Sequence, residues 1–213
     1  MKALTVTGGL ILASQSPRRK FLLEQAGLPF TVVVSRVNES SVAWSDPVRY
    51  TRDLALAKAG EVSDRFPDSW VIGADTIVVA DEELLEKPVS RDDARRMLRR
   101  LSGRPHEVYT GFSVVQRRSG HVYGETVRSE VFFKALSDAE IEWYVHTDEP
   151  YDKAGAYAIQ GLGSFLVKAV SGSYTCVVGL PVCEVLAYLS EIGVLRREFC
   201  AADVRPAGAV HVG

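Results

Sequence analysis

One carboxylate stands inside an apolar run of the 213-residue chain. Asp75 follows Val71–Ala74 in a stretch that predicts one central strand, Trp70–Ala74 and Thr76–Ala80, interrupted at Asp75. A buried carboxylate is costly unless it is paired, hydrogen-bonded or bound to a metal. The pattern leaves two interpretations open. Asp75 is either a catalytic or metal-binding residue near a strand end, or a structural residue that caps a neighbouring loop.

A second chemical motif, Ser14–Arg19, connects a short apolar run to the start of a helix. Ser16 suits an N-cap position and Pro17 suits the first helical turn. The unpaired N–H groups and the dipole at a helix N-terminus attract anions, whereas a cation is disfavoured there. The adjacent Arg18 and Arg19 therefore favour a phosphate partner. The alternative is a capped helix with two solvated arginines.

Other polar residues carry a weak functional signal when each is taken alone. Glu39, Lys58 and Lys87 would ordinarily be surface charges. Gln160 offers both a donor and an acceptor and could read the edge of a nucleobase, but it could equally be a turn residue. Asp152-Lys153 lies in the same loop and is ambiguous.

Motifs for several other chemistries are missing from the sequence. It contains no GxxxxGK[ST] loop, no HExxH motif and no GxSxG elbow. The 4 His are too scattered for a zinc cluster, and the 3 Cys cannot form a fully paired disulfide framework. Catalysis would then depend on carboxylates, Lys and Arg, which suits a metal-bound phosphate substrate.

The elements that must position these residues alternate between strands and helices before a hairpin follows. Besides the central strand, we expect strands at Leu10–Ala13, Phe30–Ser35 and Phe165–Val170, and a hairpin of Glu107–Arg117 with His121–Ala135. We expect helices from Ser16 to Gly27, Asp46 to Arg65, Ser90 to Leu101, Ser137 to His146 and Pro181 to Gly193. This order predicts an α/β fold with a mixed sheet.

The composition argues against several classes of protein. The 25 Lys and Arg against 27 Asp and Glu give a net charge of −2, without the basic excess of a nucleic-acid binder. No apolar run reaches the roughly 18 residues that span a bilayer, and the N-terminus is too weak for a secretory signal. We expect a cytoplasmic protein without nucleic-acid or membrane partners. Residues 1–195 are expected to form a single domain, and residues 196–213 a flexible C-terminal tail.

Taken together and in order, these segments resemble the Maf family of nucleoside triphosphate pyrophosphatases. The resemblance extends from about Leu10 to Leu195, and so many motifs in one order are highly specific. The matching segments are Ser14–Arg19, Leu54–Ala59, Gly73–Thr76, Glu86–Pro88, Leu101–Gly103, His106, Asp152–Tyr157, Ile159–Gly161, Gly172–Tyr174 and Val178–Pro181.

The resemblance implies a mixed twisted sheet flanked by helices, with two lobes around a central cleft, as in Maf/ITPase-like proteins. It implies hydrolysis of a nucleoside triphosphate to the monophosphate and pyrophosphate with a divalent metal cation (Mg, Mn or Co). The stretch Asp152–Gly161 is similar to the branch that acts on dTTP and UTP. The resemblance also implies a homodimer.

Residue roles follow from the same resemblance. Asp75 matches the proposed proton acceptor, and Glu39 with Asp75 would hold the metal. The substrate-binding and specificity positions would be Ser14, Arg18, Arg19, Lys58, Thr76, Lys87 and Gln160. Two positions depart from the family pattern: Asn38 stands where many members carry an acidic residue, and Ala158 replaces a common Gly.

Two other functions fit the same motifs. One is a broader house-cleaning pyrophosphatase that removes modified nucleotides. The other is a nucleotide-binding regulator of septum formation and cell division. The combination of Asp75 with Lys58 and Lys87 favours catalysis, because a pure sensor does not need a carboxylate that activates water.

Overall fold

A mixed sheet forms the centre of the protein, which a computed structural model describes for residues 3–198. The strand order is β3-β2-β4-β6-β7-β8, with β5 attached to β4. β2 is parallel to β3 and β4, whereas β4, β5, β6, β7 and β8 pair with antiparallel neighbours. The strands are β2 Leu10–Leu12, β3 Thr31–Val32, β4 Trp70–Ala80, β5 Glu83–Leu85, β6 Pro105–Gln116, β7 His121–Phe133 and β8 Val167–Ser171. The predicted mixed sheet and hairpin are confirmed.

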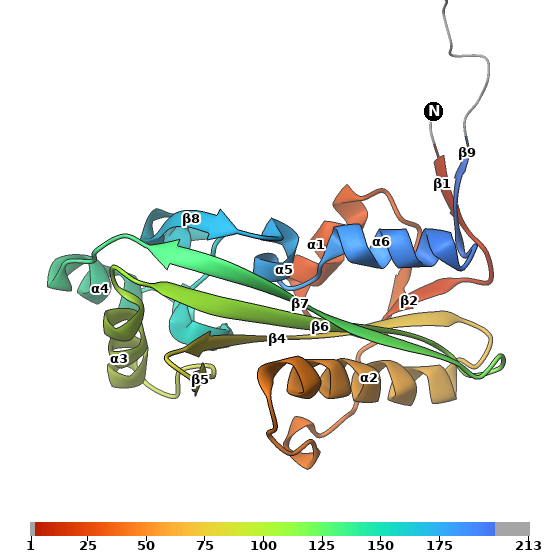
Figure 1. The fold of residues 1–213 in the computed structure, drawn as a ribbon, viewed down its shortest axis with the longest axis horizontal. Coiled ribbons are helices and arrows are strands. Elements are labelled where there is room, and N and C mark those ends of the chain that lie inside the picture. Colours follow the sequence, from red (N-terminus) through yellow and green to blue (C-terminus); the bar gives the residue numbers. More distant parts are fainter. Residues whose placement is uncertain (1–2, 199–213) are drawn as a thin grey trace, which may run out of the picture.

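Helices cover both faces of this sheet, as Figure 1 shows. α2 (Pro47–Arg65) crosses one face, while α1 (Pro17–Gln25), α5 (Tyr174–Val178) and α6 (Val182–Glu191) lie over the other. α3 (Arg91–Leu101) and α4 (Asp138–Val145) pack together at one end. Four short 3₁₀ helices complete the connections: η1 Glu39–Ser41, η2 Glu149–Asp152, η3 Ala154–Ala156 and η4 Gly161–Leu166. No helix between residues 3 and 198 has the length and apolar character needed to cross a bilayer.

Four helices begin at the residues where the sequence predicts a helix start. Each cap side chain accepts a hydrogen bond from the backbone N–H three residues later, which satisfies a donor that the helix itself leaves unpaired. These caps are Ser16, Asp46, Ser90 and Ser137. Because capping is local, sequence reasoning located these helix starts correctly.

β4 runs through Asp75 without a break, so the predicted interruption of the strand is wrong. Asp75 lies opposite Gly111 of β6 in a continuous antiparallel ladder. The backbone of an Asp can make ladder hydrogen bonds like that of any other residue; only its side chain needs a polar partner. That partner comes from α2.

The two ends of the described chain pair with each other. β1 (Ala3–Val6) is antiparallel to β9 (Leu195–Glu198) in a separate two-stranded sheet. Arg196, where we expected a flexible tail to begin, lies opposite Thr5 in this ladder. The remainder of the expected tail, residues 199–213, lies outside the described residues.

Buried apolar side chains form two main clusters, which correspond to the expected lobes. One surrounds α3 and α4 and includes Leu98 and Tyr144. The other surrounds α1 and α6 and includes Leu23 and Leu189. β4 and β6 contribute to both clusters, so the long strands connect the two lobes.

α2 approaches the sheet closely at two glycines. A Cβ on Gly73 would lie 2.2 Å from the carbonyl oxygen of Ala55, and a Cβ on Gly111 would lie 2.4 Å from that of Thr51. Side chains two residues apart on a strand share a face, so Gly73 faces α2 together with Asp75. The glycine therefore sets how near α2 comes to the strand position that carries this carboxylate.

We expect Gly73→Ala to lower the free energy of unfolding by about 2–3 kcal/mol, because the added methyl group forces α2 away from β4. Urea unfolding measures this loss. Gly60→Ala, on α2, is the control: its Cβ would meet no atom within 4 Å. The control should be neutral or more stable by up to about 1 kcal/mol, since Ala favours a helix over Gly. Equal effects of the two substitutions would contradict the packing argument.

His106 is a buried, neutral histidine and should make stability depend on pH. It is 3% exposed, packs against the Phe133 ring, and its Nε2 lies 2.8 Å from the Tyr157 hydroxyl. Burial lowers the pKa of His106 from 6.5 to about 4. Between these values the unfolded chain binds a proton that the folded protein does not, so this stability is complete above pH 6.5 and declines as pH falls toward 4.

Between pH 7 and 5 this group should cost about 2 kcal/mol of unfolding free energy. Urea unfolding at both pH values measures the loss in the wild-type protein and in His106→Gln, which cannot titrate. The variant is expected to lose about 2 kcal/mol less across this interval. The same pH dependence in both proteins would show that His106 is not the source.

Candidate active site

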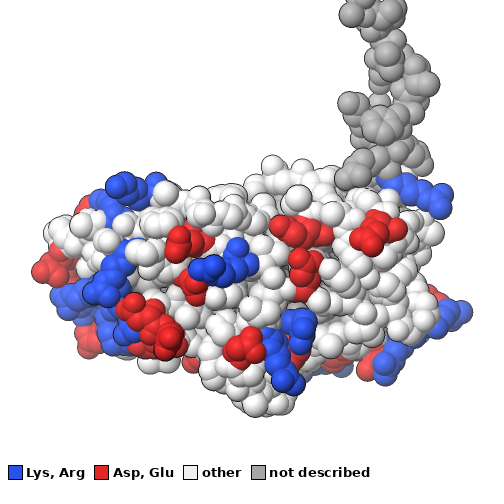
Figure 2. All heavy atoms as spheres, in the orientation of Figure 1, with Lys and Arg blue, Asp and Glu red and all other residues white. Residues whose placement is uncertain are grey.

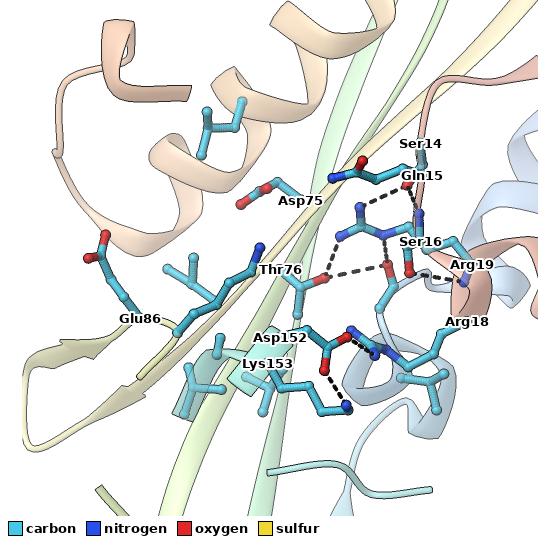
Figure 3. Close-up of a pocket in the computed structure, with 18 of the residues that line it drawn as sticks. Ser14, Gln15, Ser16, Arg18, Arg19, Asp75, Thr76, Glu86, Asp152 and Lys153 are labelled. Carbon is cyan, nitrogen blue, oxygen red and sulfur yellow. Dashed lines mark hydrogen bonds and ion pairs between the residues drawn. The ribbon is translucent and has the colours of Figure 1, made fainter. Parts of the chain in front are cut away.

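A cavity of about 710 Å³ lies where β2, α2, β4 and the η2–η3 segment meet. Its walls include apolar residues from both lobes, such as Tyr157 and Val178. They also include every residue that the sequence implicated, namely Ser14, Arg18, Arg19, Glu39, Lys58, Asp75, Thr76, Lys87 and Gln160. The fold thus brings together groups that are far apart in the chain, and Figure 3 shows many of them around the cavity.

Lys58 of α2 connects two carboxylates in this cavity. Its Nζ lies 2.7 Å from Asp75 Oδ1 and 2.8 Å from Glu39 Oε1. The side chains of Lys58 and Asp75 are each 11% exposed, whereas that of Glu39 is 59% exposed. Charge-assisted hydrogen bonds of this length are strong, so the Asp75 carboxylate is held in one position, with a small part of it exposed to solvent.

Glu39 lies at the first position of η1, beyond the end of β3. Partial burial raises the pKa of its carboxyl, but the hydrogen bond and charge of Lys58, with the charges of Lys87 and Arg19, outweigh this effect and lower it. Asn38, the departure from the family pattern, caps η1: its Oδ1 lies 3.2 Å from the Ser40 backbone nitrogen that donates to it. Asn38 is thus used locally, and Glu39 is the residue that reaches Lys58.

Asp75 and Thr76 serve opposite faces of β4. Alternation along the strand turns Asp75 toward α2 and Thr76 toward α1 and α5. The Thr76 hydroxyl lies 2.9 Å from that of Thr110 and accepts a hydrogen bond from Arg19. Two adjacent residues of β4 therefore contact Lys58 on one face of the sheet and Arg19 on the other.

Arg19 is fixed by three hydrogen bonds. Nε donates to the Gly179 carbonyl at 2.7 Å, Nη2 to Thr76 Oγ1 at 3.1 Å and Nη1 to Ser14 Oγ at 3.3 Å. Burial lowers the pKa of Arg19, while nearby Asp75 raises it. Because a guanidinium retains its proton in proteins, Arg19 supplies a fixed positive charge beside the cavity, as Figure 3 shows.

Arg18 reaches across the cavity to the η2 segment. Its Nη1 lies 3.1 Å from Asp152 Oδ2, and Lys153 pairs with the same carboxylate. Burial raises the pKa of Asp152, but Lys153 and Arg18 outweigh this effect and lower it. The Asp152-Lys153 pair, ambiguous in the sequence, therefore belongs to the cavity wall (Figure 3).

Lys87 and Gln160 are also in the wall, but their side chains make no hydrogen bond or ion pair within residues 3–198. Lys87 is exposed and Gln160 is half-buried. Unlike Arg19, both are available to a ligand without first breaking an internal contact.

Sequence reasoning gave no role to Tyr50, and it named Glu86 and Lys153 only as parts of matching segments, although all three line the wall. Tyr50, Leu54 and Lys58 are spaced by four residues, so they share one face of α2, and all three line the cavity. The spacing of Tyr50 from Lys58 could therefore have indicated from the sequence that Tyr50 lies near the site. Burial and the charges of Asp75, Glu86 and Glu39 raise the pKa of its hydroxyl.

The cavity wall carries many charged side chains of both signs. Five cationic and four carboxylate side chains line it: Arg18, Arg19, Lys58, Lys87 and Lys153, and Glu39, Asp75, Glu86 and Asp152. On the face shown in Figure 2, basic and acidic side chains are interspersed over the end that carries α3 and α4. Cations at several points of one cavity suit an extended polyanion, and a fixed carboxylate beside them suits proton transfer.

Comparisons with known proteins agree with this geometry. The family model described as Maf-like protein matches residues 9–192. A dTTP/UTP pyrophosphatase of Syntrophus aciditrophicus is 47% identical over 190 residues, covering 89% of this chain and 93% of that protein. Proteins of the same name from Symbiobacterium thermophilum and Bacillus cereus are 50% and 45% identical over 185 residues each, covering 86% and 87% of this chain and 94% and 96% of those proteins. The resemblance stated from the motifs is confirmed, and the chain belongs to the Maf family.

Proposed function

We propose that this protein is a nucleoside triphosphate pyrophosphatase that hydrolyses dTTP and UTP to the monophosphate and pyrophosphate. The observation that carries the proposal is the Lys58-bound Asp75 carboxylate in the same cavity as Arg18, Arg19 and Lys87. The name of the relatives, dTTP/UTP pyrophosphatase, supports the choice of nucleotide.

The cations of the cavity would hold the phosphates. A triphosphate carries about four negative charges near neutral pH, and its reaction spreads charge over the transferring oxygens. Lys87 has no hydrogen bond to break within the described part of the chain, Arg19 is already oriented, and Arg18 can exchange Asp152 for a phosphate. Ser14 supports this arrangement by accepting a hydrogen bond from Arg19.

The carboxylates fit a divalent cation that binds together with the substrate. No group of three or more His, Cys, Asp or Glu side chains suited to a metal is present in residues 3–198. Magnesium typically uses one or two carboxylates and completes its shell with phosphates and water. Glu39 and Asp75, both within hydrogen-bond distance of Lys58, would supply these two carboxylates. The bound cation would neutralise charge on the phosphates.

Asp75 would act as the general base. It would take a proton from a water whose oxygen attacks the α-phosphorus, and the α–β anhydride bond would break to release pyrophosphate. Lys58 would keep the carboxylate oriented, as its 2.7 Å contact with Oδ1 indicates. Gln160, Thr76 and Arg18, which line the same cavity, would set the choice of nucleotide.

Three broader properties belong to the same proposal. Residues 1–195 would act as one domain, because the cavity is built from segments between Ala13 and Gly179. The protein would function in the cytoplasm without nucleic-acid or membrane partners. It would form a homodimer, which light scattering of the purified protein tests directly.

A nucleotide panel tests the proposed reaction. Purified protein is incubated with dTTP, UTP, CTP, dATP, GTP and modified triphosphates in Mg²⁺, Mn²⁺ or Co²⁺, and pyrophosphate and monophosphate are measured. We expect both products in equal amounts, with the highest kcat/KM for dTTP and UTP. Release of single phosphate with diphosphate would refute cleavage at the α–β bond. Higher kcat/KM for modified nucleotides would favour the house-cleaning alternative, and binding without hydrolysis would favour the regulator.

A further inference from the structure

The loop that carries Gln160 is held from one side by a carboxylate outside the cavity. Glu149, at the start of η2, accepts hydrogen bonds from two consecutive backbone amides, Leu162 N at 2.9 Å and Gly163 N at 2.7 Å. Its Oε1 also accepts from the Tyr144 hydroxyl at 2.8 Å. Hydrogen bonds to a charged acceptor are the stronger ones, so these contacts fix the backbone just after Gln160.

The same tyrosine holds the loop from its other side. The Tyr144 hydroxyl accepts a hydrogen bond from Ala158 N at 3.2 Å, and the residue is wholly buried. Burial and the bond to Glu149 raise the pKa of Tyr144, so it remains a neutral hydroxyl that can donate and accept at once. Tyr144 and Glu149, which are hydrogen-bonded to each other, therefore hold the backbone two residues before and two residues after Gln160.

Two glycines make room for this pair. A Cβ on Gly161 would lie 2.4 Å from Glu149 Oε2, and Gly161 has a φ of +80°. A Cβ on Gly163 would lie 2.5 Å from the Tyr144 hydroxyl. A side chain at Gly161 would displace the Glu149 carboxylate, and one at Gly163 would displace the Tyr144 hydroxyl and the Ala158 carbonyl oxygen, which would lie 2.4 Å from the added Cβ.

We propose that Glu149 is a positioning residue that makes Gln160 selective among pyrimidines; this rests on the proposed function, in which Gln160 reads the base. Uracil and thymine present an N–H donor between two carbonyl acceptors, whereas cytosine presents an amino donor beside a ring acceptor. A mobile amide could turn to meet either edge, because it carries both a donor and an acceptor. A backbone fixed on both sides limits the side-chain conformations in which that amide can reach the base, and so restricts the base edges that it can meet.

Glu149 also shares its short helix with the second proposed specificity contact. η2 ends at Asp152, which binds Arg18, and the Glu149 carbonyl accepts a hydrogen bond from Lys153 Nζ at 2.6 Å. One four-residue element thus sets the position of both Gln160 and the partner of Arg18.

Glu149→Gln tests the proposal, because it keeps the shape but turns one acceptor oxygen into an NH₂ group that faces a backbone N–H. We expect the ratio of kcat/KM for UTP over CTP to fall at least about fivefold, mostly through a higher KM for UTP, with kcat within about threefold of wild type. Glu142→Gln is the matched control: it lies on α4 and pairs with Arg95 outside the cavity. Its UTP/CTP ratio should equal that of the wild-type protein.

A cycle with Gln160→Ala separates positioning from a general structural role. If Glu149 acts through Gln160, Glu149→Gln should change the ratio less than about twofold in the Gln160→Ala background. Equal loss of kcat/KM for UTP and CTP, or the same change of the ratio in both backgrounds, would overturn the proposal. The Kd values of wild-type protein and Glu149→Gln for UTP and CTP, measured by calorimetry without divalent metal, test the effect of Glu149 on binding separately from turnover. A wild-type protein that releases no pyrophosphate would overturn the proposed function alone.

Discussion

Replacement of Asp75 by Asn is expected to lower kcat for dTTP and UTP by at least about 10²-fold, because an amide cannot accept the proton of the attacking water. The change is nearly isosteric, and the amide oxygen can still accept the hydrogen bond that Lys58 Nζ makes at 2.7 Å. The strand should therefore persist, and KM should change less than kcat. Steady-state release of pyrophosphate at saturating nucleotide measures the effect.

Asp138→Asn is the matched control for this experiment. Asp138 pairs with Arg99, and its side chain is 82% exposed outside the cavity. Turnover of this control should equal that of the wild-type protein. If Asp75→Asn kept turnover within about threefold of wild type, Asp75 would not be the base, and a second proton acceptor would have to be sought in the cavity.

Local features of the fold were readable from the sequence, and features set by distant partners were not. The caps at Ser16, Asp46, Ser90 and Ser137 each involve residues three apart, so their signal lies in one short stretch. The β1–β9 pairing joins the two ends of the described chain, and Leu195–Glu198 has no alternating apolar pattern that would predict a strand.

The expected break at Asp75 shows why one residue type can mislead. In the sequence, an Asp between apolar residues indicates an interruption, because a buried charge needs a partner. Lys58 supplies that partner from α2, and Gly73 and Gly111 let the helix come close enough. None of these relations is visible in the stretch around Asp75 itself.

The sequence predicted which residues gather in the candidate site better than it predicted the contacts that they make with one another. The motifs identified nine residues, and all of them line one cavity. The sequence could not show that Arg19 is tied to Gly179 or that Arg18 is paired with Asp152, since these contacts join segments more than 130 positions apart. It also gave no reason to select Glu149, whose effect on the site passes through two backbone amides.

Lys58→Met is expected to reduce kcat/KM by at least about 10²-fold and to destabilise the fold by about 3 kcal/mol. Removing one partner of a buried ion pair leaves the other charge uncompensated, and here Asp75, whose side chain is 11% exposed, loses its cation; Glu39, at 59% exposed, loses the same partner but stays hydrated. The pKa of Glu39 should rise, because the effect of partial burial would then be opposed only by the charges of Lys87 and Arg19. Because Glu39 must be ionised to hold the divalent cation in the proposed reaction, the acid limb of the pH–rate profile should move to higher pH. Pyrophosphate release from pH 5 to 9, together with urea unfolding, measures both effects.

Lys168→Met is the control, because it removes an exposed lysine of β8 outside the cavity. It should leave kcat/KM and the free energy of unfolding unchanged. Lys58→Arg keeps the charge, but a planar guanidinium cannot replace one ammonium nitrogen that lies 2.7 and 2.8 Å from two separate carboxylates, so it should restore stability more than kcat/KM. Full activity of Lys58→Arg would mean that the site needs only a positive charge at this position. Full activity of Lys58→Met would mean that Asp75 needs no partner to act, and the assignment of Lys58 to the reaction would be wrong.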